Sequence, residues 1–151
     1  MIISLDAKHI QGLDLSPVQE AIATTSPTSL EQQIRFEISY PREPNDPREL
    51  SEIPEIRLWF VRLDAAYPWF LFLLDGQGGE LYRYVAMLVP HQFSRTEGIQ
   101  YNPEALEIFV MHKMFILSDW LKQQQISSPA KLKALAQTLG YELDNSFFAL
   151  L

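Results

Sequence analysis

Two short segments in the first third of the chain carry the pattern of strands. Residues 2–5 are mostly apolar and predict a short edge strand, and residues 34–40 place a large apolar side chain at every second position. An alternation of period two is typical of a strand with one buried face and one wet face. Between them we expect a helix to begin at Ser16 and Pro17, with the Ser16 side chain as its cap.

Three apolar runs follow in the middle of the chain, and we expect each of them to form a strand. They cover residues 56–63, 69–74 and 81–89. Each run is short and apolar on both faces, which favours strands at the centre of a sheet. A glycine-rich segment, residues 75–79, has the composition of a hairpin loop between the second run and the third.

The last third of the chain has helical periodicity. Asn102, Pro103 and Glu104 supply a cap, a proline for the first turn and an acid that suits the helix dipole. From there to about residue 124 the apolar positions fill one half of a helical wheel. A second, weaker patch lies on the opposite side of this helix, and we expect both sides to be packed; it consists of Ile108, Met111 and Phe115.

A further helix is expected to begin at Ser128 and Pro129 and to end at Gly140. Together these elements predict an α+β fold in a single domain, residues 1–151. In this prediction a mostly antiparallel sheet of about four strands is covered by helices, and the longest helix spans residues 103–124.

Composition changes this picture by excluding several classes of protein. The 151 residues are 47% apolar and carry a net charge of −7, with no cysteine. An acidic chain argues against a nucleic-acid partner, which needs a cationic surface. The longest apolar run has six residues, so we expect no direct membrane insertion, and no signal peptide is recognised, so we expect a cytoplasmic location. Without cysteine the chain offers neither a thiol nucleophile nor a thiolate ligand for a metal cluster.

The negative charge is concentrated in the first third of the chain, because residues 1–55 hold 10 acidic and 4 basic side chains, a net charge of −6. Within this third we expect the proline-rich acidic segment, residues 40–55, to be an extended loop with at most one helical turn, at Asp46 and Pro47. One interpretation is a solvated outer layer of the fold. The other is an acidic docking face for a basic partner, with Glu49, Glu52 and Glu55 as candidate binding residues.

Motifs for catalysis and for cofactors are not recognised. The glycines of residues 76–79 are not followed by Lys-Ser/Thr, and we expect a strand after them, so they fit no phosphate-binding loop. The three histidines, His9, His91 and His112, do not have the spacing of helical metal ligands. We therefore expect no catalytic residues, no metal and no cofactor.

Two features remain without an explanation from packing alone. The segment after the third apolar run joins polar, aromatic and cationic residues, and functional loops often have this character; its candidate binding residues are Pro90, His91, Gln92, Phe93 and Arg95. The second feature is Lys113, which lies near the centre of the apolar half of the long helix. Its ammonium group either reaches water past Leu117 or meets an acid such as Asp64.

Three blocks in order resemble the chlororespiratory reduction 6 family of cyanobacteria and chloroplasts, over about residues 57–124. The blocks are Ile-Arg-Leu-Trp-Phe-Val-Arg-Leu-Asp at 56–64 with Tyr-Pro-Trp at 67–69, Met-Leu-Val-Pro-His-Gln at 87–92, and Asn-Pro-Glu-Ala-Leu-Glu at 102–107 running into Trp-Leu-Lys-Gln-Gln at 120–124.

This resemblance implies a role in assembling the peripheral arm of the photosynthetic NAD(P)H dehydrogenase-like complex, in the cytoplasm or the plastid stroma. The implied client is an iron–sulfur subunit, subunit I, and the implied protein is a chaperone and not an enzyme. Two alternatives stay open. One is a small-ligand protein or enzyme whose pocket uses His91 and Arg95, and the other is a permanent subunit of a larger complex.

Overall fold

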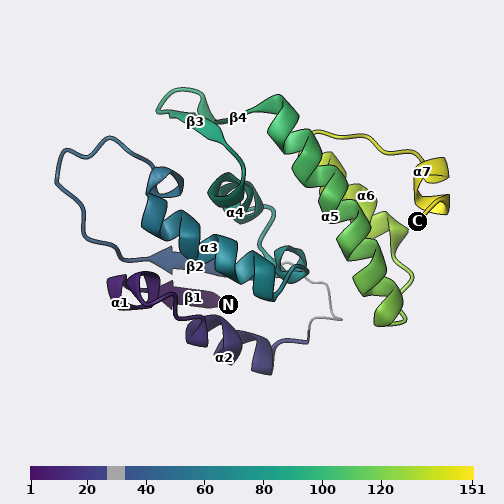
Figure 1. Cartoon of the computed structure of the whole chain (residues 1–151), viewed down its shortest axis with the longest axis horizontal. Coiled ribbons are helices and arrows are strands. Elements are labelled where there is room, and N and C mark those ends of the chain that lie inside the picture. Colours follow the sequence, from purple (N-terminus) through teal and green to yellow (C-terminus); the bar gives the residue numbers. More distant parts are fainter. Residues whose placement is uncertain (27–32) are drawn as a thin grey trace. The chain divides into compact units, whose positions relative to one another are not determined.

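Strands β1 (Ile2–Leu5) and β2 (Arg35–Ile38) form a parallel pair, with Ile3 opposite Phe36 (Figure 1). Parallel neighbours need a crossover connection, and the chain between them includes helices α1 (Ala7–Gln11) and α2 (Ser16–Thr24). Ile3 and Phe36 are buried while Ser4 and Glu37 are exposed. The two strands predicted from the sequence are therefore confirmed.

The computed structural model describes residues 1–26 and 33–151, and Glu31 of the acidic first third lies outside the described residues. The chain divides into two compact units, residues 1–102 and residues 103–151. Helices make up 54% of the structure and strands 12%. The single domain expected from the sequence stays a prediction.

The expected helix begins where it was predicted, but the role assigned to Ser16 is wrong. Leu15 occupies the cap position of α2, and no side chain caps the helix. The Ser16 hydroxyl donates instead to the Asp14 carboxylate, at 3.0 Å, and that carboxylate also accepts from the Ser16 amide. The hydroxyl is therefore used in a turn that precedes the helix and is not aimed at its first amides.

The first central run is a helix and not a strand. Helix α3 (Pro54–Ala66) has proline in its first turn, followed by Glu55, and it comes directly after the short 3₁₀-helix η2 (Leu50–Glu52). No helical turn forms at residues 46–47, so the turn of the acidic segment lies later than expected. The buried residues of α3 recur at helical spacing: Ile56, Trp59, Phe60 and Leu63.

The second and third runs are also not strands. The second forms the 3₁₀-helix η3 (Phe70–Leu73), which is buried on all sides, and the third forms helix α4 (Glu80–Leu88). The expected hairpin loop is instead the turn that leads into α4. Gly79 occupies the cap position with φ +79°, a conformation that favours glycine.

An aromatic cluster forms the centre of residues 1–102. The Phe60 ring makes edge contacts with Phe36, Trp59 and Tyr84 at centroid distances of 5.0, 4.9 and 5.9 Å. The polar atoms at its edge are paired: the Trp59 indole donates to the Asp14 carbonyl at 2.8 Å, and the Tyr84 hydroxyl donates to Asp64 at 2.9 Å. Burial, with Asp64 beside it, raises the pKa of Tyr84 well above its usual value.

A second small sheet, an antiparallel hairpin of β3 (His91–Ser94) and β4 (Gly98–Tyr101), completes this unit. The expected sheet of about four strands is thus wrong in its arrangement, because the described strands form two separate pairs. The α+β class is confirmed, with a larger share of helix than the sequence indicated.

Residues 103–151 are helical, as predicted. Helix α5 (Pro103–Gln123) is the expected long helix, α6 (Pro129–Thr138) packs against it, and α7 (Asn145–Ala149) follows near the end of the chain (Figure 1). Gly140 has φ +91° just beyond α6, as suits a glycine after a helix end.

The two sides of α5 differ from the expectation. Ile108 is 70% exposed and Phe115 is 51% exposed, so the second apolar patch is not packed as predicted. Lys113 is only 3% exposed, which overturns the idea that its ammonium group reaches water. The Lys113 Nζ atom lies 5.7 Å from the centre of the Phe109 ring, a favourable cation–π arrangement. Its pairing with Asp64 stays a prediction.

Candidate functional site

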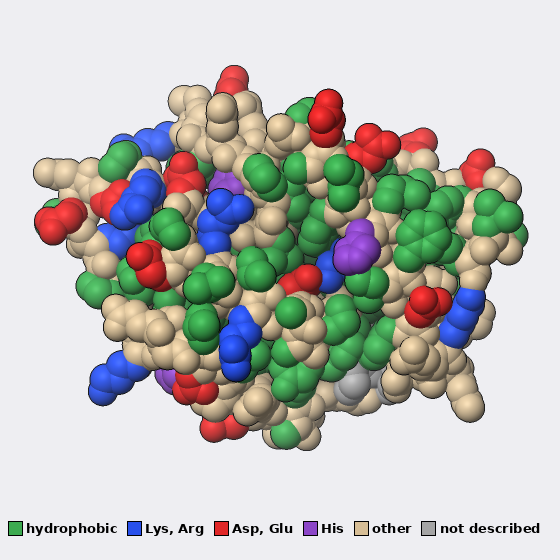
Figure 2. Space-filling view, viewed as in Figure 1, with side chains coloured by type: hydrophobic (Ala, Val, Ile, Leu, Met, Phe, Trp, Pro, Cys, Tyr) green, Lys and Arg blue, Asp and Glu red, His purple; other side chains and the backbone are tan. Residues whose placement is uncertain are grey.

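The acidic segment is an extended stretch whose charges are partly paired. Arg48 forms an ion pair with Asp46 at 2.8 Å, and the Arg42 guanidinium donates to the Arg48 carbonyl. Figure 2, at the left of the view, shows acidic and basic side chains next to one another on the surface there. Glu43 and Glu55 are exposed and keep this surface negative.

The carboxylate of Asp46 gives this segment a defined pH dependence. Hydrogen bonds from the Arg48 side chain and backbone lower the pKa of Asp46 to about 2 from its usual 3.8. A lowered pKa means that the pairing stabilises the turn above pH 3.8, and that this contribution is lost as the pH falls from 3.8 towards 2. An NMR titration of the Asp46 carboxyl carbon should give its midpoint near pH 2. In an Arg48→Gln variant we expect the midpoint to rise towards 3.8, and an unchanged midpoint would contradict the role of Arg48.

Two glutamates fold the end of the acidic segment into η2. The Glu49 carboxylate accepts from the Ser51 amide and the Glu52 carboxylate accepts from the Glu49 amide, each at 2.6 Å. This reciprocal pattern is a capping box, which satisfies amides that a short helix leaves without partners. The same two glutamates that were predicted to bind a partner therefore also fix the local backbone.

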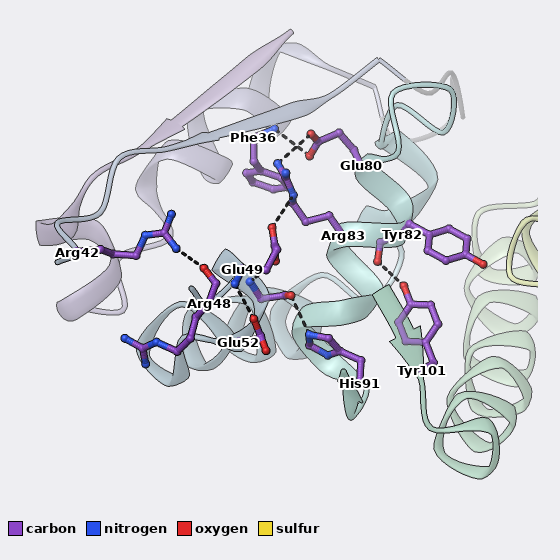
Figure 3. Close-up of polar contacts among 11 residues, drawn as sticks. Phe36, Arg42, Arg48, Glu49, Glu52, Glu80, Tyr82, Arg83, His91 and Tyr101 are labelled. Atoms are coloured by element: carbon purple, nitrogen blue, oxygen red, sulfur yellow. Dashed lines mark hydrogen bonds and ion pairs between the residues drawn. The ribbon is translucent and has the colours of Figure 1, made fainter. Parts of the chain in front are cut away.

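His91 joins the hairpin to this turn, as Figure 3 shows. Its Nε2 atom lies 2.8 Å from the Ser51 hydroxyl and its Nδ1 atom lies 3.0 Å from the Val89 carbonyl. Because a carbonyl can only accept, Nδ1 carries the proton, and in the neutral ring Nε2 accepts from Ser51. Both nitrogens of His91 therefore have partners.

A second link runs from Glu49 to α4 and on to strand β2 (Figure 3). The Arg83 guanidinium lies 3.5 Å from the Glu49 carboxylate and 3.9 Å from that of Glu80. Glu80 is buried, and its carboxylate accepts from the Phe36 amide at 3.3 Å. Two carboxylates thus surround one guanidinium, so this cluster keeps a net negative charge.

Two open hollows flank the hairpin. One, of about 380 Å³, is lined by Pro90, His91 and Gln92 together with Gln100, Tyr101 and Asn102. The other, of about 310 Å³, brings Phe93 of β3 next to Glu49, Glu80 and Arg83. The Tyr101 hydroxyl donates to the Tyr82 carbonyl, and burial raises the pKa of Tyr101.

The structure brings most of the predicted binding residues together. Six of them lie on or next to the hairpin or in the η2 turn that His91 contacts. Those at the hairpin are Pro90, His91, Gln92 and Phe93, and those at η2 are Glu49 and Glu52. Two lie apart from these contacts: Arg95 is exposed at the tip of the hairpin, and Glu55 lines a different hollow, which includes Arg42 and Arg48. We call the hairpin, η2 and the acidic segment, residues 40–55 and 90–101, the hairpin surface.

The contacts that organise this surface use residues that sequence analysis did not identify, namely Ser51, Glu80, Arg83 and Tyr101. Glu80 and Arg83 have the i, i+3 spacing of a helical ion pair, but that signal depends on recognising α4 as a helix. Nothing in the sequence joins Ser51 to His91, forty positions later.

The geometry bears on three kinds of feature, namely a phosphate cradle, a metal site and a membrane-spanning helix. The loop at residues 75–79 offers no phosphate cradle, because the Asp75 carboxylate already accepts from the Gln77 and Gly78 amides at 3.0 Å. Among residues 1–26 and 33–151, no three acidic or histidine side chains are grouped closely enough to hold a metal ion. Across the same ranges, no helix has the length and apolar character needed to cross a bilayer.

Comparison with models of protein families gives a match. A family model described as chlororespiratory reduction 6 matches residues 5–150, nearly the whole chain. The match extends well beyond the residues 57–124 that carried the resemblance, and it includes the acidic segment and the C-terminal helices. No solved structure matches this chain.

Proposed function

Because this chain belongs to the chlororespiratory reduction 6 family, we propose that it is a non-enzymatic, chaperone-like assembly factor for the peripheral arm of the photosynthetic NAD(P)H dehydrogenase-like complex. The family name supports a role in the accumulation or assembly of that complex. In this proposal the client is iron–sulfur subunit I, which the chain holds until the subunit docks. The observation that carries the proposal is the family match over residues 5–150.

The side chains around the hairpin support a binding role over a catalytic one. The Ser51 hydroxyl beside His91 Nε2 belongs to a fully buried side chain, so this pair does not present a nucleophile at the surface. Arg95 is not among the residues that line the hollow beside His91. The open, mixed polar and aromatic surface instead resembles the rim of a transient protein interface.

The absence of cysteine from the sequence limits the ways in which the chain could assist the assembly of its proposed client. Iron–sulfur clusters are held mainly by cysteine thiolates, and this chain has none. It therefore acts in our proposal by covering client surface and not by carrying the cluster. The hairpin surface, which bears Glu43, Glu49, Glu52 and Glu55, is the proposed contact, with a basic region of the client opposite it.

Affinity capture from a photosynthetic cell tests this function. We expect the tagged chain to recover subunit I, identified by mass spectrometry, from fractions that contain assembly intermediates. A chain that recovers only unrelated enzymes would contradict the proposal. A chain that migrates with the finished complex at fixed stoichiometry would be a permanent subunit and not an assembly factor.

A further inference from the structure

Strand β3 of the hairpin has an outer edge that bears open backbone groups. The Asn102 amide donates to the Pro90 carbonyl at 2.9 Å, which makes these two residues a hydrogen-bonded pair of the antiparallel ladder. Hydrogen-bonded and non-hydrogen-bonded pairs alternate along such a ladder, so the amides and carbonyls of His91 and Phe93 point away from β4. In the part of the chain that the structure describes, none of these four groups has a hydrogen-bond partner. An edge of this kind can take up a further strand.

The hollow beside Phe93 indicates which side chain an added strand would carry. Residues directly opposite each other in neighbouring strands place their side chains on the same face of the sheet. Phe93 lines a hollow of about 310 Å³ together with Glu49, Glu80 and Arg83. A residue that pairs with Phe93 would direct its side chain to this face. Because two carboxylates surround one guanidinium there, a lysine or arginine is favoured at that position.

The hairpin is joined to the acidic segment through β3 and not through β4. The Ser51 hydroxyl of η2 lies 2.8 Å from His91 Nε2, whereas Tyr101 of β4 donates to the Tyr82 carbonyl of α4 (Figure 3). A basic chain is attracted most strongly where acidic side chains are concentrated. Of the two edges of the hairpin, the outer edge of β3 is therefore the one that suits a basic strand.

We propose that an extended, basic segment of the client adds as a third strand to the outer edge of β3. Its backbone pairs with the outward groups of His91 and Phe93, and a lysine or arginine of the segment lies opposite Phe93. In recognition by strand addition, backbone hydrogen bonds supply affinity and side-chain hollows supply specificity. The identity of the client rests on the proposed function, but the open edge does not.

The length of β3 predicts a contact that is easily reversed. The strand covers only His91–Ser94, and its outer edge offers two amides and two carbonyls. Each hydrogen bond replaces one made to water and so contributes little by itself. Four such bonds can hold a segment of a partly folded client and still release it when the client docks.

Proline substitutions on the two facing strands test which edge is used. Phe93→Pro removes one outward amide and leaves the bonds of the β3–β4 ladder in place. We expect it to weaken binding of the purified client by roughly tenfold, and Phe93→Val, which keeps the amide, to weaken it less. Ile99→Pro is the matched variant, because Ile99 stands opposite Phe93 and its amide points from the other edge of the hairpin. We expect its loss to be at most about twofold.

A synthetic peptide makes a second test that does not need the client. The probe is an eight-residue peptide that alternates lysine and valine, and its control alternates glutamate and valine. Hydrogen exchange followed by NMR reads the edge directly. With the lysine peptide at about ten times its dissociation constant, we expect the His91 and Phe93 amides to exchange roughly tenfold more slowly than in the free chain. The Gln92 amide, which is bonded within the ladder, should be protected in both states.

The two tests separate the proposed function from the mode of binding. A client that binds Phe93→Pro with full affinity, or that is weakened equally by Phe93→Pro and Ile99→Pro, would overturn the inference and leave the function standing. A client that does not bind the wild-type chain would contradict the function, and the peptide would still decide whether the edge accepts a strand. Unchanged exchange at His91 and Phe93 with the lysine peptide, or equal protection by the glutamate peptide, would overturn the inference in either case. Circular dichroism of each variant checks that the fold remains.

Discussion

Replacing Trp59 with alanine is expected to destabilise the first unit by about 4 kcal/mol, the usual size of a large aromatic truncation in a core. Trp59 is fully buried, its ring packs on Phe60, and its indole is bonded to the Asp14 carbonyl. The substitution leaves a cavity and removes that hydrogen bond together. Urea unfolding followed by fluorescence and circular dichroism measures the change in the free energy of unfolding.

A matched variant separates packing from hydrogen bonding. Trp59→Phe keeps an aromatic ring but loses the indole N–H, so we expect a smaller loss of about 1–2 kcal/mol. A natural domain has roughly 5–15 kcal/mol to lose, so the alanine variant should remain foldable but fragile. Equal losses for the two variants would show that the hydrogen bond and not the ring volume controls stability here.

If the proposed function is right, reversing the charge of Glu43 and Glu55 is expected to weaken binding to the proposed client, iron–sulfur subunit I, by roughly tenfold at low salt. Both side chains are exposed, and the ion pair of Asp46 with Arg48 and the capping box of η2 use neither carboxylate. The expected loss comes from repulsion between the new lysines and a basic client surface. Calorimetry of the E43K/E55K variant against purified client measures it.

The salt dependence of this effect distinguishes charge from shape. At about 1 M salt the screening length falls to roughly 3 Å, so wild type and variant should bind with similar, weaker affinity. The control variant E20K/E37K makes the same change of net charge on α2 and β2, outside the hairpin surface. If the control loses as much affinity as E43K/E55K, the acidic segment has no special part in binding.

Sequence analysis predicted correctly the elements whose pattern of apolar and polar residues is clear along their whole length. Helix α5 starts at Asn102 and Pro103 and continues for about six turns with one clear apolar side, so its period could not be mistaken. Strands β1 and β2 each have a buried face and an exposed face. In these cases the local pattern and the surrounding structure agree.

The runs in the middle of the chain were misread for a physical reason. A short segment that is buried on most sides loses its periodicity, so a helix and a central strand look alike. In α3 the exposed Leu58 and Val61 are as apolar as the buried positions, which hid the helical spacing of the core residues. Pro54 followed by Glu55 was the available signal of a helix start.

The candidate site was predictable residue by residue but not as an arrangement. The unusual composition of residues 90–95 and of the acidic segment could be seen directly in the sequence. Their meeting through Ser51 and His91, and the link from Glu49 through Arg83 to Glu80, depend on how α3 and α4 are placed. No pattern within residues 90–95 or within the acidic segment indicates that the two lie next to each other in the fold.

The hydrogen bond from the Phe36 amide to the Glu80 carboxylate bears on aggregation, because it covers part of one edge of the β1–β2 sheet. An uncovered strand edge is a template on which further strands can add, and this leads to fibrils. On the side of β2 away from β1, the Ile34 carbonyl accepts from the Asp75 amide and Glu80 accepts from Phe36. The chain thereby occupies two of the positions on this edge of β2 at which a foreign strand would begin to add.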